Sequence, residues 1–193
     1  MKKPLRQGEM DGLCGIYSVL NSVRYLLGSK FSQEDENILF SKLISNFYRN
    51  SERQPNPVEF VYKGITSREL SYLLTITRNF LKKKEINLFW SKPLQKSNRP
   101  KTIDQFWIKI NESLIKYEKS ILIMDYNWMV DKKESGHWTC ATSVTDKTIV
   151  LYDSSSDGKN IIRLTKSKCA LEKPTKDKPH FLVSHNVTLL WIQ

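Results

Sequence analysis

The segregation of helical and strand-like patterns along the chain constrains the fold most. Helix periodicity or helix-start signals occur in the first two-thirds, at 14–28, 33–48, 66–84 and 102–114. Strand-like segments follow in the last third, at 120–126, 137–144, 148–152, 160–164 and 183–192. Because helices and strands do not alternate, the pattern favours an α+β fold with an antiparallel sheet over repeated βαβ units.

The length of 193 residues fits one domain. We expect a helical lobe at about 1–118 and a sheet lobe at about 119–193. No segment has the 18 or more apolar residues of a membrane span, and residues 1–9 lack the apolar core of a signal peptide. These features predict a cytoplasmic protein, although export by a dedicated secretion system would leave no trace in such a sequence.

Three cysteines, Cys14, Cys140 and Cys169, are widely spaced and form no CxxC pair. This spacing predicts neither a disulfide framework nor a metal site, and it fits a reducing compartment. The formal net charge is +11, with basic residues spread over 82–84, 92–101 and 173–178. We interpret them as a lysine-rich solvated surface. A basic surface would also suit an acidic protein substrate, so the charge alone does not decide the function. Nucleic-acid binding is the alternative, but no recognisable nucleic-acid module accompanies the charge.

Cys14 is predicted to lie at the N-terminus of the first helix, where apolar residues recur from Ile16 to Leu27. The positive end of a helix lowers a thiol pKa, and its free N–H groups can stabilise an oxyanion. Gly12 is a small neighbour that would let a substrate backbone approach closely. Gln7, seven positions before the cysteine, is near enough for its amide to complete an oxyanion hole. The alternative for Cys14 is a buried, inert thiol.

His137 and Asp153 are placed to meet across a β-hairpin. His137 opens one strand-like segment, and Asp153 follows the next one, after a turn at 145–147. A hairpin brings the end of its second strand beside the start of its first, so the carboxylate can orient the imidazole. An oriented base beside a nucleophile is the arrangement of catalytic triads.

The order Gln7, Cys14, His137, Asp153 resembles that of the papain-like cysteine peptidase superfamily. The chain is most similar to two compact branches: the peptidase domains that cleave double-glycine leaders of bacteriocins, with their stand-alone relatives, and the Josephin-type ubiquitin hydrolases. The segments that carry the resemblance are 7–17, 136–138 and 151–154. It implies a papain-like fold in which Cys14 is the nucleophile, His137 the base and Asp153 its orienting partner.

The expected reaction is acyl transfer through a thioester, with no metal or organic cofactor. The first-choice substrate is a peptide bond in a bacterial leader or target protein, and the second is a ubiquitin-like isopeptide bond. A Gly-Gly-containing substrate is one candidate. Deamidation and transglutaminase-like transfer use the same chemistry and stay open, as does a role as a secreted effector. A non-catalytic protein- or nucleic-acid-binding module is the alternative of another class.

Other residues near the expected site each have two interpretations. Gly136, Trp138 and Trp128 could contact substrate, with Trp128 in the loop before His137. Trp138 could shield the His137–Asp153 pair from water or could equally be core packing, and a loop aromatic such as Trp128 more often serves packing. Cys140 and Cys169 are expected in the core. His180 and His185 are alternative bases, although neither precedes an acidic residue at hairpin spacing.

Overall fold

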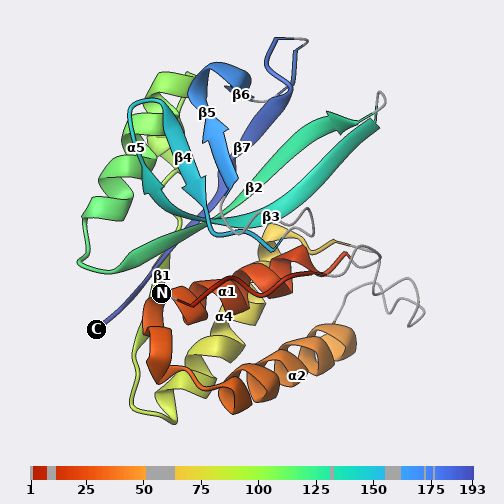
Figure 1. The fold of residues 1–193 in the computed structure, drawn as a ribbon, viewed down its shortest axis with the longest axis vertical. Helices are drawn as coiled ribbons and strands as arrows, with labels where there is room; N and C mark the ends of the chain where they lie inside the picture. The colour runs from red at the N-terminus through yellow and green to blue at the C-terminus, as the bar shows by residue number, and fades with distance from the viewer. Residues whose placement is uncertain are drawn as a thin grey trace.

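The computed structural model describes residues 2–7, 12–50, 64–130, 133–154, 162–171, 173–175 and 177–193 (Figure 1). Its helices are α1 (Cys14–Leu27), α2 (Gln33–Asn50), α4 (Ser67–Lys82) and α5 (Ile103–Ile115). The expected helix starts are confirmed. Thr66 forms a capping box with Glu69, and the Thr102 hydroxyl accepts from the Gln105 N–H at 3.2 Å.

The strands form one seven-stranded sheet in the order β1-β7-β2-β3-β4-β5, with β6 also paired to β7. All of these neighbours are antiparallel except β6 and β7, which run parallel. The α+β class is thus confirmed. The strands are β1 (Leu88–Ser91), β2 (Ser120–Val130), β3 (Lys133–Val144), β4 (Thr148–Leu151), β5 (Ile162–Thr165), β6 (Cys169–Leu171) and β7 (His180–Ile192).

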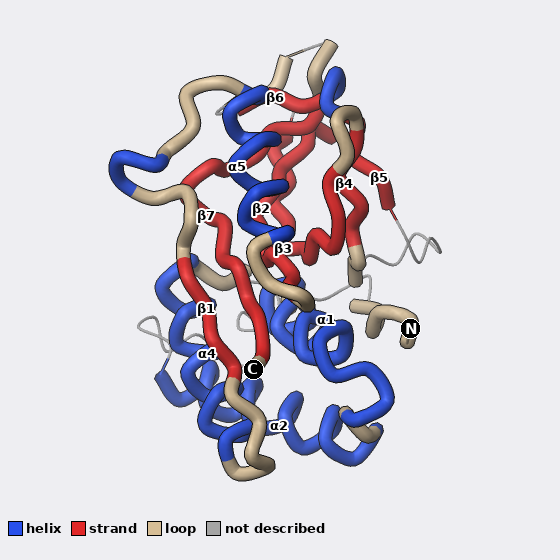
Figure 2. Tube along the Cα trace, turned by 90° about the vertical axis from the view of Figure 1, so that its left-hand side faces the viewer, coloured by secondary structure: helices blue, strands red, loops and turns tan. Residues whose placement is uncertain are grey.

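The two faces of the sheet carry different helices, as Figures 1 and 2 show. Alternate residues of β2 point to opposite faces. Ile121 and Ile123 join the core formed with α1, α2 and α4, whereas Leu122 and Met124 join the core formed with α5. The lobe boundary near residue 118 therefore does not follow the packing, because α5 and β1 precede it and both belong with the sheet.

Residues 2–7 form a strap that lies along α1. The side-chain amide of the fully buried Asn21 bonds twice to Leu5, accepting from its N–H at 2.7 Å and donating to its carbonyl at 3.1 Å. The Arg24 Nε donates to the Lys3 carbonyl at 2.6 Å. Side chains of α1 thus fix a segment that has no regular structure of its own. Among the described residues, no helix combines the length and apolarity needed to cross a membrane.

Candidate active site

Cys14 is the first residue of α1, as predicted. The first turn carries no acidic residue, so no side-chain charge of that turn offsets the partial positive charge of the helix N-terminus. The residue is 6% exposed, and its Sγ accepts from the Trp138 N–H at 3.5 Å. Sγ also lies 3.9 Å from the Gly12 carbonyl oxygen. A thiolate at this position would be stabilised by the helix and by one backbone donor.

Buried polar contacts hold α1 against β3, the strand that carries His137. The Ser18 hydroxyl donates to the Trp138 carbonyl at 2.8 Å, and the Cys140 thiol donates to the Ser18 carbonyl at 3.1 Å. Burial raises the pKa of the Cys140 thiol to about 12. Cys140 is therefore a protonated core residue, as expected, and it helps to set the distance between the helix and the strand.

His137 and Asp153 meet as the hairpin spacing predicted. The His137 Nε2–H donates to Asp153 Oδ1 at 2.7 Å, and Asp153 is 1% exposed. The same oxygen accepts from the Thr139 hydroxyl and from the Ser154 N–H, both at 2.8 Å. Thr139 was not singled out from the sequence, although its place two residues after His137 on the same strand face was a usable signal. These bonds fix the carboxylate and, through it, the imidazole.

The electrostatics of His137 favour its charged form. Burial alone would lower its pKa, but hydrogen bonds and charge interactions with Asp153 and Cys14 outweigh that effect. Together they raise the pKa from 6.5 to about 10. Because Asp153 occupies Nε2, Nδ1 is the nitrogen left to face the Cys14 thiol. The arrangement can therefore hold an imidazolium beside a thiolate.

The strap, residues 2–7, places Gln7 close to Asp153. Its backbone N–H donates to the Ser154 carbonyl at 2.7 Å, so Gln7 lies beside the residue that follows Asp153. Gly136, directly before His137, is exposed, and a Cβ there would lie 2.6 Å from Asn127 Oδ1. Gln7 is thus brought to the catalytic end of the molecule, and Gly136 has no room for a side chain without a shift of Asn127.

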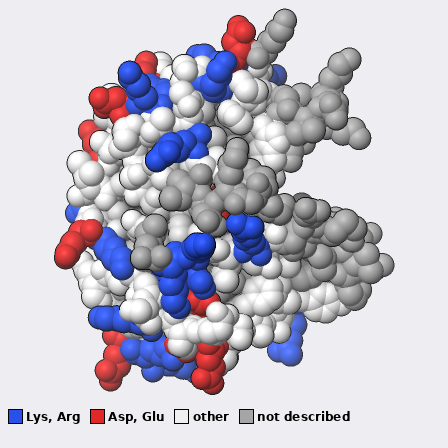
Figure 3. All heavy atoms as spheres, in the orientation of Figure 1, with Lys and Arg blue, Asp and Glu red and all other residues white. Residues whose placement is uncertain are grey.

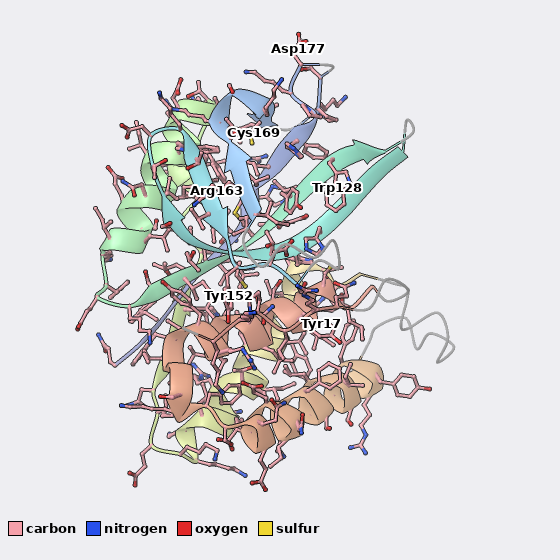
Figure 4. All side chains as sticks on the ribbon, in the orientation of Figure 1. Tyr17, Trp128, Tyr152, Arg163, Cys169 and Asp177 are labelled. Atoms are coloured by element: carbon pink, nitrogen blue, oxygen red, sulfur yellow. The ribbon has the colours of Figure 1, made fainter. Side chains whose placement is uncertain are left out.

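The two tryptophans differ from each other. Trp138 is 5% exposed, and its indole N–H donates to the Ile65 carbonyl at 2.8 Å, so the geometry favours packing over substrate contact. The expectation that Trp128 lies in a loop was wrong. Trp128 is part of β2, on the hairpin that β2 forms with β3 (Figure 4). A loop was expected because the polar Asn127 interrupts the apolar pattern of 120–126 and charged residues follow at 131–134.

The alternative bases, His180 and His185, both lie on β7. His185 is exposed on β7, and the ring of His180 lies 6.3 Å from that of Tyr126. Within the described ranges, no group of three or more His, Cys, Asp or Glu side chains could hold a metal ion. On the face drawn in Figure 3, Lys and Arg side chains are scattered, with Asp and Glu among them.

Comparisons with known proteins add little to this geometry. No family model matches the chain, and no curated protein matches it significantly. Among solved structures it is similar to the peptidase domain of Streptococcus ComA, a bifunctional ABC transporter involved in a quorum sensing pathway. The TM-score is 0.44 at 13% sequence identity, over 100% of this chain and 98% of that one. A TM-score below 0.5 does not establish a shared fold, so the function is inferred from the site alone.

Proposed function

We propose that the protein is a papain-like cysteine peptidase that cleaves a peptide or isopeptide bond of a protein substrate. Cys14 attacks the carbonyl as a thiolate and forms a thioester. His137 donates a proton from Nδ1 to the leaving amine, and Asp153 keeps the imidazole oriented throughout. In the second half-reaction His137 activates the water that releases the acyl group.

One observation supports the proposal above all: the buried imidazole of His137 is hydrogen-bonded to the Asp153 carboxylate and also interacts with the Cys14 thiol. The 2.7 Å bond to Asp153 fixes one face of the ring, and the interactions with Asp153 and Cys14 raise the His137 pKa to about 10. A core histidine with a structural role needs a hydrogen-bond partner but has no need of a thiol at a helix N-terminus. Perturbed titratable groups in this combination are typical of active sites.

The oxyanion would form at the N-terminus of α1. The Cys14 N–H is one donor, and the Gln7 side-chain amide is the second. The Gln7 backbone bond to Ser154 supports this role, because it ties Gln7 to the segment that carries Asp153. Backbone and amide donors directed at a developing oxyanion contribute about a hundredfold or more to turnover.

The identity of the substrate rests on charge and chemistry alone. With a formal net charge of +11, the protein would attract an acidic protein segment. A Gly-Gly-containing peptide is our first candidate, and a ubiquitin-like isopeptide is the second. Substrate profiling with acidic peptides distinguishes them, because an isopeptidase would ignore the linear bond.

The pH dependence of alkylation tests the proposal. Each thiol is labelled with iodoacetamide between pH 5 and 9 and quantified by peptide mass spectrometry, in the wild type and in His137→Ala. We expect Cys14 to react at pH 6 at least roughly tenfold faster in the wild type than in the variant. Cys140 and Cys169 are internal controls, because burial raises the pKa of both thiols to about 12.

Equal and slow labelling of Cys14 in both proteins would contradict the peptidase proposal. Salt-dependent binding of the same protein to nucleic acid would then favour the basic binding module. His137→Gln repeats the comparison with a side chain that retains a hydrogen-bond donor, which separates loss of the base from loss of packing.

A further inference from the structure

Two aromatic side chains of β2 form a surface against His137. Tyr126 and Trp128 are two residues apart and stack at 5.1 Å between ring centroids, with an interplanar angle of 29°. Both meet the imidazole edge to face, at 5.7 Å for Tyr126 and 5.9 Å for Trp128. Tyr126 is 6% exposed, whereas Trp128 is only half-buried. The pair therefore consists of a buried supporting ring and an indole that is partly open beside the reacting group.

The position of this pair follows from the strand order. β3, which carries His137, lies between β2 and β4. Asp153 follows β4 and binds Nε2 from one side, so Tyr126 and Trp128 flank the imidazole from the other side. Neither aromatic residue takes part in the proposed proton transfers. Trp128 is half-buried, so part of its indole is accessible.

Among the described residues, Trp128 has aromatic neighbours on its own strand and on β7. Its partner across the strand pair is His180, whose ring also lies against Tyr126. Burial lowers the pKa of His180, which favours the neutral form of its ring. A surface of neutral aromatic rings binds an aromatic or large apolar side chain through area burial and ring contacts. The net charge of +11 disfavours a cationic side chain at the same place.

The chemistry fixes which part of a substrate reaches this surface. His137 Nδ1 must transfer its proton to the leaving nitrogen, so that nitrogen lies within about 3 Å of the imidazole. The Cα atom of the residue after the scissile bond is bonded directly to this nitrogen. The acyl side of the scissile bond is instead held at the N-terminus of α1. The leaving residue is therefore the part of the substrate nearest to Trp128.

We infer that Trp128, supported by Tyr126, binds the residue immediately after the scissile bond, and that this residue carries an aromatic or large apolar side chain. The inference rests on the proposed function and narrows its substrate class. It places the specificity on the leaving-group side of the bond. The acyl side, at Cys14, is not involved in this selection.

Acyl transfer to added amines tests the inference without knowledge of the natural substrate. p-Nitrophenyl acetate acetylates Cys14 and releases p-nitrophenolate. The acetyl thioester then reacts with water or with an amine, whose nitrogen occupies the place of the leaving group. In that step the C–N bond forms, the C–S bond breaks, and the amine proton passes to His137, which restores the imidazolium–thiolate pair. The measurement is the ratio of N-acetylphenylalaninamide to N-acetylalaninamide formed from equal amounts of the two amino acid amides.

We expect the wild type to favour phenylalaninamide by about tenfold, as a single apolar pocket does. Trp128→Ala should bring the ratio close to one, and Trp128→Phe should restore much of it. Because the ratio is measured within one protein sample, partial unfolding of a variant does not change it. Trp90→Ala, which removes a half-buried indole on β1, is the matched control and should keep the wild-type ratio.

The two possible failures are distinguishable. If p-nitrophenyl acetate gives no p-nitrophenolate burst that depends on Cys14, the peptidase proposal fails and takes this inference with it. If the burst occurs but the wild type shows no preference, or if Trp128→Ala keeps the preference, the assignment of Trp128 is wrong while the peptidase proposal stands.

Discussion

The charge of Asp153 should control the protonation of His137, and Asp153→Asn isolates that charge. An asparagine Oδ1 has the same size and can accept the same hydrogen bonds from His137, Thr139 and Ser154, but it is neutral. In the wild type, Asp153 and Cys14 together raise the His137 pKa from 6.5 to about 10 against the effect of burial. An opposite charge at hydrogen-bond distance accounts for about 1 to 3 pKa units. The variant should therefore lose about 2 units, or roughly 3 kcal/mol of preference for the imidazolium.

Asp153→Asn should shift the pH dependence of hydrolysis to lower pH. His137 is protonated below its pKa, so a lower pKa means that the imidazolium is lost at a lower pH. The alkaline limb of the hydrolysis rate should move down by the same amount. NMR titration of the imidazole Cε1–H resonance measures the pKa, since the chain has only three histidines and His137→Gln identifies the signal.

Asp104→Asn is the matched control for the loss of one carboxylate. Asp104 is exposed and pairs with Lys166, far along the chain from the site, so its loss should leave the His137 titration unchanged. A wild-type His137 that titrates near 6.5, or an Asp153→Asn variant with the wild-type pKa, would refute the account of the ion pair given above.

Other variants test the surroundings of the site. Gln7→Ala should lower kcat by about a hundredfold with little change in KM, because an oxyanion donor acts in the transition state; an equal rise in KM would contradict this. Gly15→Ala would place a Cβ 2.1 Å from Ile65 Cδ1 and should lower the free energy of unfolding by about 1 to 3 kcal/mol in urea titration. Adding Ile65→Ala should recover part of that loss if the clash is its cause. Asn21→Ala leaves the Leu5 N–H and carbonyl without their partner and should cost about 2 to 3 kcal/mol of stability. Asn21→Ala should also lower kcat, because residues 2–7 position Gln7. The double variant with Gln7→Ala should therefore have the same kcat as Gln7→Ala alone.

The parts of the site that follow local patterns could be predicted from the sequence. The helix at Cys14 has a clear apolar period, and His137 and Asp153 lie on neighbouring strands of one hairpin. The short strands β1 and β6 were missed, because each forms only by pairing with β7, far along the chain or across a loop. The exposure of Trp128 and the burial of Trp138 could not be predicted either, since they depend on which helix covers which face of the sheet.

The distance between Cys14 and His137 depends on buried polar groups more than on apolar packing. An apolar helix face can slide along a sheet by one turn, about 5.4 Å, and still bury much of its surface. Such a slide would carry the Cys14 thiol beyond hydrogen-bond reach of the imidazole. It would also break the bonds that Ser18 makes with the Trp138 carbonyl and the Cys140 thiol. Each buried group left without a partner costs about 1 to 3 kcal/mol, which is enough to select one position of α1. These bonds lie one turn from Cys14, so the polar contacts that specify the fold also specify the geometry of the nucleophile.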